Sequence, residues 1–74
     1  MKIENQKEIM SRFAQQRVKF GTQEKLAEIV EVSAKSISDF ETCRRNPSFG
    51  TFIKMCIAIN ADINYIVYGD IKGN

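Results

Sequence analysis

The side chains best suited to hydrogen-bond chemistry in this chain lie close together, between residues 34 and 39. Lys35 can donate to the acceptors of guanine, and Asp39 can accept from the amino group of cytosine. Ser36 can pair with either base type, and the methyl group of Ala34 can pack against that of thymine. The chemistry of these side chains is compatible with contact to the edges of DNA bases. The alternative for each is a solvated face of a helix.

Other chemistries find few candidates in the chain. It has no histidine, and its two cysteines, Cys43 and Cys56, lie 13 residues apart, which is not a zinc-binding pattern. No glycine-rich loop that could hold a phosphate is present. We therefore expect no enzyme activity, no metal, no cofactor and no small-molecule ligand. The cysteines are expected to be free thiols in a reducing cytoplasm.

Length and composition predict a single domain. The chain has 74 residues, of which 43% are hydrophobic and 27% charged, values that are typical of a soluble globular protein. We expect the domain to span residues 1–74, with an N-terminal extension at 1–7 and a flexible tail at 70–74. No apolar run approaches the about 20 residues that cross a bilayer, which predicts a cytoplasmic protein without membrane contact.

The net charge of +2 is distributed unevenly along the chain. Residues 1–21 carry five Lys or Arg and two Glu, and residues 42–74 carry four Lys or Arg and two Asp. Residues 22–41 carry two Lys against five acidic residues, although nucleic-acid-binding surfaces are usually basic. This acidic segment counts against DNA binding unless its glutamates face away from the duplex.

Apolar spacing and capping residues predict an all-α fold of five short helices. We expect Gly21 to end the first helix in a left-handed conformation, as glycine often does. Asn60 suits the left-handed end of the fourth helix, and Gly69 stops the fifth. The expected helices lie at residues 5–19, 23–30, 34–42, 49–59 and 63–68, and the last four follow the N-cap residues Thr22, Ser33, Ser48 and Asp62.

The second and third expected helices are separated by only about three residues, 31–33. Apolar residues hold these helices together, and Ala27 is small where they cross. Such a unit exposes the first turns of its second helix, which can then enter the major groove of DNA. The spacing predicts a helix-turn-helix, and the alternative is an ordinary helical hairpin that binds nothing.

Several separated motifs occur in the order that is found in one family. These are Thr22 to Ala27 (TQEKLA), Val32-Ser33, Ile37 to Glu41 (ISDFE) and Arg45-Asn46-Pro47. On these motifs the chain resembles the helix-turn-helix family of lambdoid phage repressors and Cro proteins, over roughly residues 9–69. The pair Tyr68-Gly69, near the end of the chain, is similar to the sequence of Cro-like members in particular. The resemblance implies a compact five-helix, lambda-repressor-like domain, in which Glu31 and Cys43 stand where glycine is common.

The resemblance also implies a role for each matching residue. Gln23 would hold a phosphate at a helix N-terminus, and Thr42 with residues 44–46 would grip the flanking DNA backbone. An inward ion pair between Arg17 and Glu41 would tie the first helix to the end of the third. The resemblance also implies that base edges face Ala34, Lys35, Ser36 and Asp39. The full expected DNA-binding set is Thr22, Gln23, Ser33, Ala34, Lys35, Ser36, Asp39, Thr42, Arg44, Arg45 and Asn46.

These features predict a sequence-specific transcriptional regulator, a repressor that occludes promoter DNA. It is expected to bind double-stranded DNA as a homodimer, because one reading helix covers too few base pairs. The two-fold interface is expected among surplus apolar residues of the C-terminal segment, which otherwise complete a small core: Ile63, Tyr65, Ile66, Tyr68 and Ile71. Two other functions stay open. One is an antitoxin or restriction-modification controller of the same fold, and the other is a helical protein-interaction module that does not bind DNA.

Overall fold

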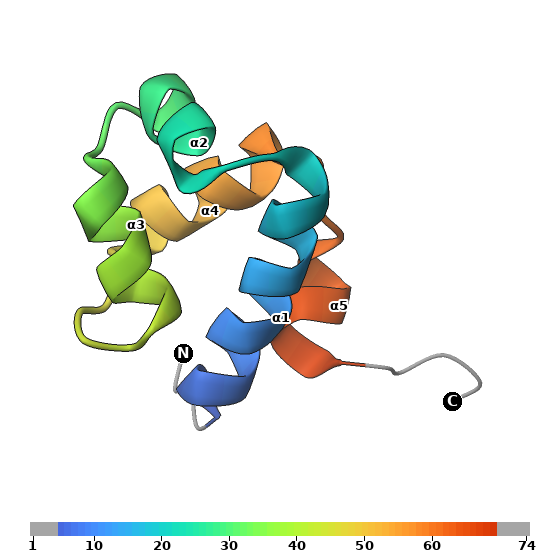
Figure 1. Ribbon diagram of the computed structural model, residues 1–74. Coiled ribbons are helices and arrows are strands. Elements are labelled where there is room, and N and C mark those ends of the chain that lie inside the picture. The colour runs from blue at the N-terminus through green and yellow to red at the C-terminus, as the bar shows by residue number, and fades with distance from the viewer. Residues whose placement is uncertain (1–4, 70–74) are drawn as a thin grey trace.

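Five α-helices follow one another in the computed structural model, which describes residues 5–69 (Figure 1). No strand occurs within this range, which confirms the all-α prediction. The expected tail at residues 70–74 lies outside the described residues, as do residues 1–4. The helices are α1 (Gln6–Phe20), α2 (Gln23–Val30), α3 (Ala34–Glu41), α4 (Phe49–Ala58) and α5 (Ile63–Tyr68).

The helix boundaries agree with those expected from the sequence to within one residue. The bounds of α2 and α5 are as predicted, whereas α1 begins and ends one residue later than expected. Thr42, expected inside the third helix, follows α3 as its C-cap. Gln6 and Lys7, which lie in both the expected first helix and the expected N-terminal extension, form the first turn of α1.

Four helices are N-capped: a side-chain oxygen accepts a hydrogen bond from a backbone N–H group in the first turn. The capping residues in the sequence predicted this. Each such cap typically contributes about 1 kcal/mol to stability, because it satisfies a donor that the helix itself leaves unpaired. The acceptors are Thr22 (from Lys25 N, 3.0 Å), Ser33 (from Ser36 N, 2.9 Å), Ser48 (from Thr51 N, 3.1 Å) and Asp62 (from Asn64 N, 3.0 Å).

Three residues other than glycine adopt the left-handed conformation at the ends of helices: Glu31 (φ 62°), Cys43 (φ 63°) and Asn60 (φ 57°). Two of them are the positions where the family commonly has glycine, and Asn60 was expected to end its helix in this way. The prediction for Gly21 is wrong. Its φ of 158° and ψ of −161° are extended, because the chain passes through Gly21 and Thr22 directly into α2.

Replacing Glu31 with glycine is expected to raise the free energy of unfolding by about 0.5–1 kcal/mol. The left-handed conformation costs an L-residue about 1–2 kcal/mol, and the greater backbone entropy of glycine offsets part of this gain. Urea denaturation measures the change. The matched control is Glu28→Gly, within the same helix, which should cost about 1 kcal/mol. Two equally destabilising substitutions would contradict strain at Glu31.

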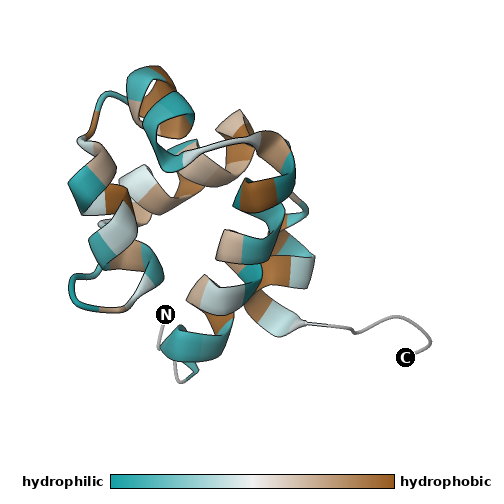
Figure 2. Cartoon of the chain, in the orientation of Figure 1, coloured by the Kyte–Doolittle hydropathy of each residue, from teal (hydrophilic) through white to brown (hydrophobic). Residues whose placement is uncertain are grey.

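The core lies where the five helices meet. α2 packs on α3 and α4, α5 lies along α1, and α1 also touches α3. Apolar residues on the inward-facing sides of the helices fill this space (Figure 2). The rings of Phe13 and Phe52 meet with centroids 6.3 Å apart. The buried residues are Ile9, Met10, Phe13, Leu26, Ala27, Ile37, Phe40, Met55, Cys56, Ile59 and Ile66.

Arg12 fastens the last helix to the first. Its guanidinium donates from Nε to the carbonyl oxygen of Ile66 (2.8 Å) and from Nη2 to that of Val67 (3.0 Å). These carbonyls lie in the final turns of α5, where helix acceptors lack partners and a cation is favoured. The contact helps to explain how a six-residue helix is held in place.

None of the described helices combines the length and apolar character that crossing a membrane requires.

The two cysteines are free thiols, as expected, and they differ in environment. Cys56 is fully buried, and burial raises the pKa of its thiol to about 11, whereas Cys43 is half-buried. Since the thiolate is the reactive form, we expect a disulfide reagent at pH 8 to modify one thiol per folded chain, at Cys43, and two after denaturation. Two fast reactions in the folded protein would contradict this.

The raised pKa also predicts a pH dependence of stability. The folded state holds the Cys56 thiol neutral, so the free energy of unfolding should fall as the pH rises from about 9 to about 11. In the Cys56→Ala variant, the part of this decrease in unfolding free energy that comes from the thiol should be absent.

Candidate nucleic-acid interface

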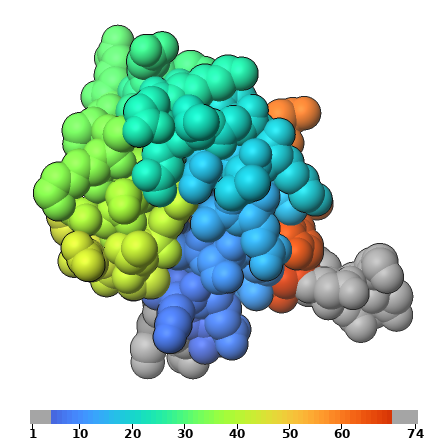
Figure 3. Space-filling view, viewed as in Figure 1, coloured from blue at the N-terminus to red at the C-terminus, as the bar shows by residue number. Residues whose placement is uncertain are grey.

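The turn between α2 and α3 determines the direction of α3. The N–H groups of Glu31 and Val32 both donate to the carbonyl oxygen of Ala27, at 2.9 and 3.3 Å, and Ser33 then caps α3. Ile37 and Phe40 anchor α3 in the core. Its other side is part of the molecular surface, at an edge of the molecule away from α5 (Figures 1 and 3). The fold therefore leaves one side of α3 on the molecular surface.

The base-facing residues predicted on α3 differ strongly in exposure. Lys35 is open to solvent, with 79% of its side chain exposed, whereas 10% of the Asp39 side chain is exposed. The Lys35 Nζ and the Asp39 Oδ2 lie 3.3 Å apart in an ion pair. Ser36 and Ala34 are half-buried. Of this set, Lys35 alone combines a charged donor with free access to a groove.

Ser33 and Ser36 form a small hydroxyl pair at the start of α3, with their Oγ atoms 2.9 Å apart. Arg45 comes back from the following loop onto this pair. Its Nη1 donates to the Ser36 Oγ at 3.1 Å, and its guanidinium lies 5.5 Å from the centroid of the Phe40 ring. A cation over an aromatic face is attractive, so Arg45 is pre-positioned against α3. This contact could not be predicted from the sequence pattern.

The loop after α3 is held by its backbone. The N–H groups of Arg44 and Arg45 donate to the carbonyl oxygen of Asp39, at 2.8 and 3.3 Å. The Thr42 hydroxyl donates to the carbonyl oxygen of Ser38 (2.9 Å), and the Asn46 side chain accepts from the Gln6 side chain on α1. The side chains of Thr42 and Arg44 are exposed. This loop thus presents an exposed cation beside the C-terminal end of α3.

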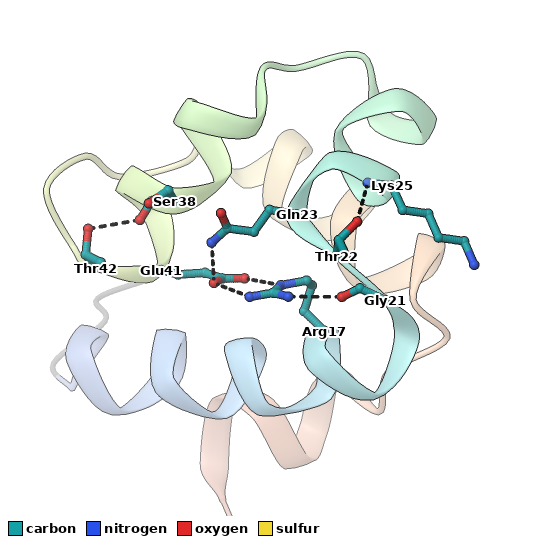
Figure 4. Close-up of polar contacts among 8 residues, drawn as sticks. All are labelled: Arg17, Gly21, Thr22, Gln23, Lys25, Ser38, Glu41 and Thr42. Carbon is teal, nitrogen blue, oxygen red and sulfur yellow. Dashed lines mark hydrogen bonds and ion pairs between the residues drawn. The ribbon is translucent and has the colours of Figure 1, made fainter.

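The structure contains the expected ion pair between Arg17 and Glu41 (Figure 4). The Arg17 Nε and Nη2 each donate to one carboxylate oxygen at 2.8 Å, and Nη1 donates to the Gly21 carbonyl oxygen at 2.9 Å. Exposed fractions of 12% and 7% leave both side chains largely buried. The hydrogen bond with Glu41 is the main cause of the raised pKa of Arg17. The pair joins α1 to α3.

Gln23 extends this network to α2. Its Nε2 donates to the Glu41 Oε1 at 3.0 Å (Figure 4). An amide nitrogen carries two hydrogens, so one donor remains for a phosphate. Thr22, the N-cap of α2, is exposed beside it. Gln23, which is expected to hold a phosphate, is therefore bonded to the ion pair that joins α1 to α3. Its position in the sequence did not predict this contact.

The residues expected at a two-fold interface differ in their exposure. Ile66 is fully buried inside the chain, so assigning it to an interface is wrong, and it belongs to the core. Ile63 and Tyr65 are half-buried, and Tyr68 is 64% exposed. Ile71 lies outside the described residues. Tyr68 is thus the predicted residue with the most free surface.

An apolar groove lies beside this segment, between α1, α4 and α5. Its lining includes Ile9, Phe52, Ile53, Ile63 and Val67. Phe49 also lines it, and 74% of this residue is exposed. Within residues 5–69, no three His, Cys, Asp or Glu side chains come together as a metal site requires. Because its lining is mostly apolar, the groove offers an apolar contact surface.

The pairing of α2 with α3 and the exposed side of α3 define a helix-turn-helix DNA-binding domain. Comparison with protein-family models matches residues 14–66, more than half of the chain, to the family described as Helix-turn-helix. The chain belongs to this family, and the resemblance to the lambdoid repressor and Cro type is confirmed. It is a DNA-binding regulator. Comparisons with curated proteins and with solved structures find no match.

Proposed function

We propose that this protein is a sequence-specific repressor that binds a two-fold-related operator as a homodimer. The observation that carries the proposal is the surface of α3. It exposes Lys35 on its first turn and leads into the loop with the exposed Arg44, while the buried Arg17–Glu41 pair ties its C-terminal end to α1. A helix held in this way can enter a major groove, where a lysine reads guanine and loop cations bind phosphate. Occupying promoter DNA then represses without any further activity.

The N-terminus of α2 supplies the second part of the proposed interface. Gln23 has one free amide donor, and the first N–H groups of α2 carry the positive end of the helix dipole. Together with Thr42 and Arg44, which follow the C-terminal end of α3, they would hold phosphates of the DNA backbone. These contacts would set the register of the protein on DNA, and Lys35 would supply the sequence preference.

A second copy of the chain is the proposed occupant of the apolar groove. The groove includes Ile63, already expected at the interface, and it reaches Asn46 and Pro47 in the loop that follows α3. A copy seated there would bring the two reading helices onto one face, as a two-fold operator requires, with half-sites about 34 Å apart. The exposed Phe49 and Tyr68 supply apolar surface next to it.

Selection from random-sequence duplexes, followed by titration across salt concentrations, tests the proposal. The retained duplexes should share a two-fold-related sequence. Four to six phosphate contacts per dimer predict a log–log slope of affinity against salt of about −4 to −5. Affinity should then fall by about 250- to 1,000-fold between 50 and 200 mM salt. No enriched sequence, or a flat salt profile, would contradict DNA recognition.

A protein-interaction module is the second candidate function. The observation that favours it is a shallow apolar hollow between α2 and α4, where Ile29 and Ile57 are 53% and 68% exposed. In addition, residues 22–41 are acidic overall. Weak, salt-insensitive association with random duplex would support this candidate over the repressor.

A further inference from the structure

The ion pair between Lys35 and Asp39 carries an inference that rests on the proposed function. The two residues are four apart on α3, so they lie on the same side of the helix. Their exposures differ, because the Asp39 side chain is 10% exposed and that of Lys35 is 79% exposed. The carboxylate therefore lies close to the helix, and the ammonium group extends beyond it into solvent.

Asp39 is poorly placed to touch a base itself. Its side chain is short and only 10% exposed, and its Oδ2 is paired with the Lys35 Nζ. To reach the amino group of cytosine, the carboxylate would have to leave both its largely buried position and its ion pair. The sequence-based role of Asp39 as a cytosine reader therefore fits the structure less well than a role that acts through Lys35.

The hydrogen-bond capacity of Lys35 fits that second role. An ammonium group has three donors, and the Nζ–Oδ2 contact of 3.3 Å uses one of them. Two donors remain, and guanine presents two neighbouring acceptors, O6 and N7, in the major groove. Keeping the ion pair would restrict the ammonium to the surface beside Asp39, with two donors left for a guanine that enters there. Binding a phosphate elsewhere would require it to leave Asp39.

We propose that Asp39 is a positioning residue that sets sequence specificity through Lys35, by holding the ammonium toward a guanine and disfavouring its contact with phosphates. The carboxylate also repels phosphates directly, which lowers affinity for any sequence. Its removal should therefore strengthen binding to random DNA and weaken discrimination at one base pair.

The test uses the full chain and three duplexes: the one recovered by selection, the same duplex with its key G·C pair replaced by A·T, and a scrambled one. Lys35→Ala should reduce discrimination at that pair by about 5- to 150-fold. Asp39→Asn, which keeps the shape but removes the charge, should reduce it by at least about 5-fold and bind scrambled duplex more tightly. Asp39→Glu should restore much of the discrimination, since it keeps the charge at the same spacing.

The double variant Lys35→Ala/Asp39→Asn separates the possible roles. If Asp39 acts through Lys35, the second substitution changes discrimination no further. A loss of discrimination that persists in the Lys35→Ala background would mean that Asp39 reads a base itself, and it would overturn the proposal. Equal weakening on all duplexes, with a lower unfolding free energy, would mean a purely structural role and would also overturn it. If the unmodified protein selects no sequence, the proposed function fails first, and this inference with it.

Discussion

Replacing Arg17 with methionine is expected to lower the free energy of unfolding by about 3–5 kcal/mol, which would leave a domain of this size largely unfolded. The substitution keeps much of the apolar stem but removes three hydrogen bonds, two to Glu41 and one to the Gly21 carbonyl. The Glu41 carboxylate, 7% exposed, would then be buried without its cation. Circular dichroism and urea denaturation measure the loss.

The double substitution Arg17→Met/Glu41→Leu is the matched control. It removes both charges, so no buried ion is left unpaired, and stability should return to within about 1–2 kcal/mol of the original protein. A cost below about 1 kcal/mol for Arg17→Met alone would mean that water reaches the carboxylate and that the pair is not buried in solution. Gln23→Ala should cost less than Arg17→Met, because it removes one neutral donor from Glu41.

Local signals in the sequence were sufficient to predict the helices. Each cap depends on a hydroxyl or carboxylate that bonds two or three residues ahead, and each helix end depends on the backbone preference of one residue. The left-handed Asn60 follows from such a preference, and Glu31 from the position of glycine in the family. Gly21 fails the same rule, because the two-residue connection to α2 requires an extended chain.

The side-chain contacts between distant elements could not be predicted in the same way. Arg12 binds carbonyl groups 54 and 55 positions away, and its partners are determined by how α5 lies on α1. The sequence indicates Asp39 as a residue on the DNA-facing side of α3, yet it is buried. The ion pair between Arg17 and Glu41 could be predicted only from the family resemblance, because spacing alone does not pair residues 24 apart. Describing the contacts within the site therefore required the tertiary structure.

Replacing Phe49 with glutamate is expected to abolish paired binding to a two-fold operator and to leave the fold intact. Phe49 is 74% exposed, so little core packing is lost. It is also the first residue of α4, where a negative charge is favoured by the helix dipole. If a second copy covers the groove, each subunit would place this charge against apolar surface, which is costly without a partner. Affinity for the full operator should fall by about 100-fold or more, as the link between the half-sites is lost.

Stoichiometry on DNA distinguishes this effect from simple charge repulsion. We expect the Phe49→Glu variant to bind a single half-site almost as the original protein does, and to bind a full operator without cooperativity. Repulsion from phosphates would instead weaken both to the same extent. Ile57→Glu is the matched control, because Ile57 is similarly exposed on α4 but lines the hollow beside α2. It should keep paired binding. If Ile57→Glu loses it and Phe49→Glu does not, the two-fold contact lies on the α2–α4 side, and the groove between α1, α4 and α5 does not hold the second copy.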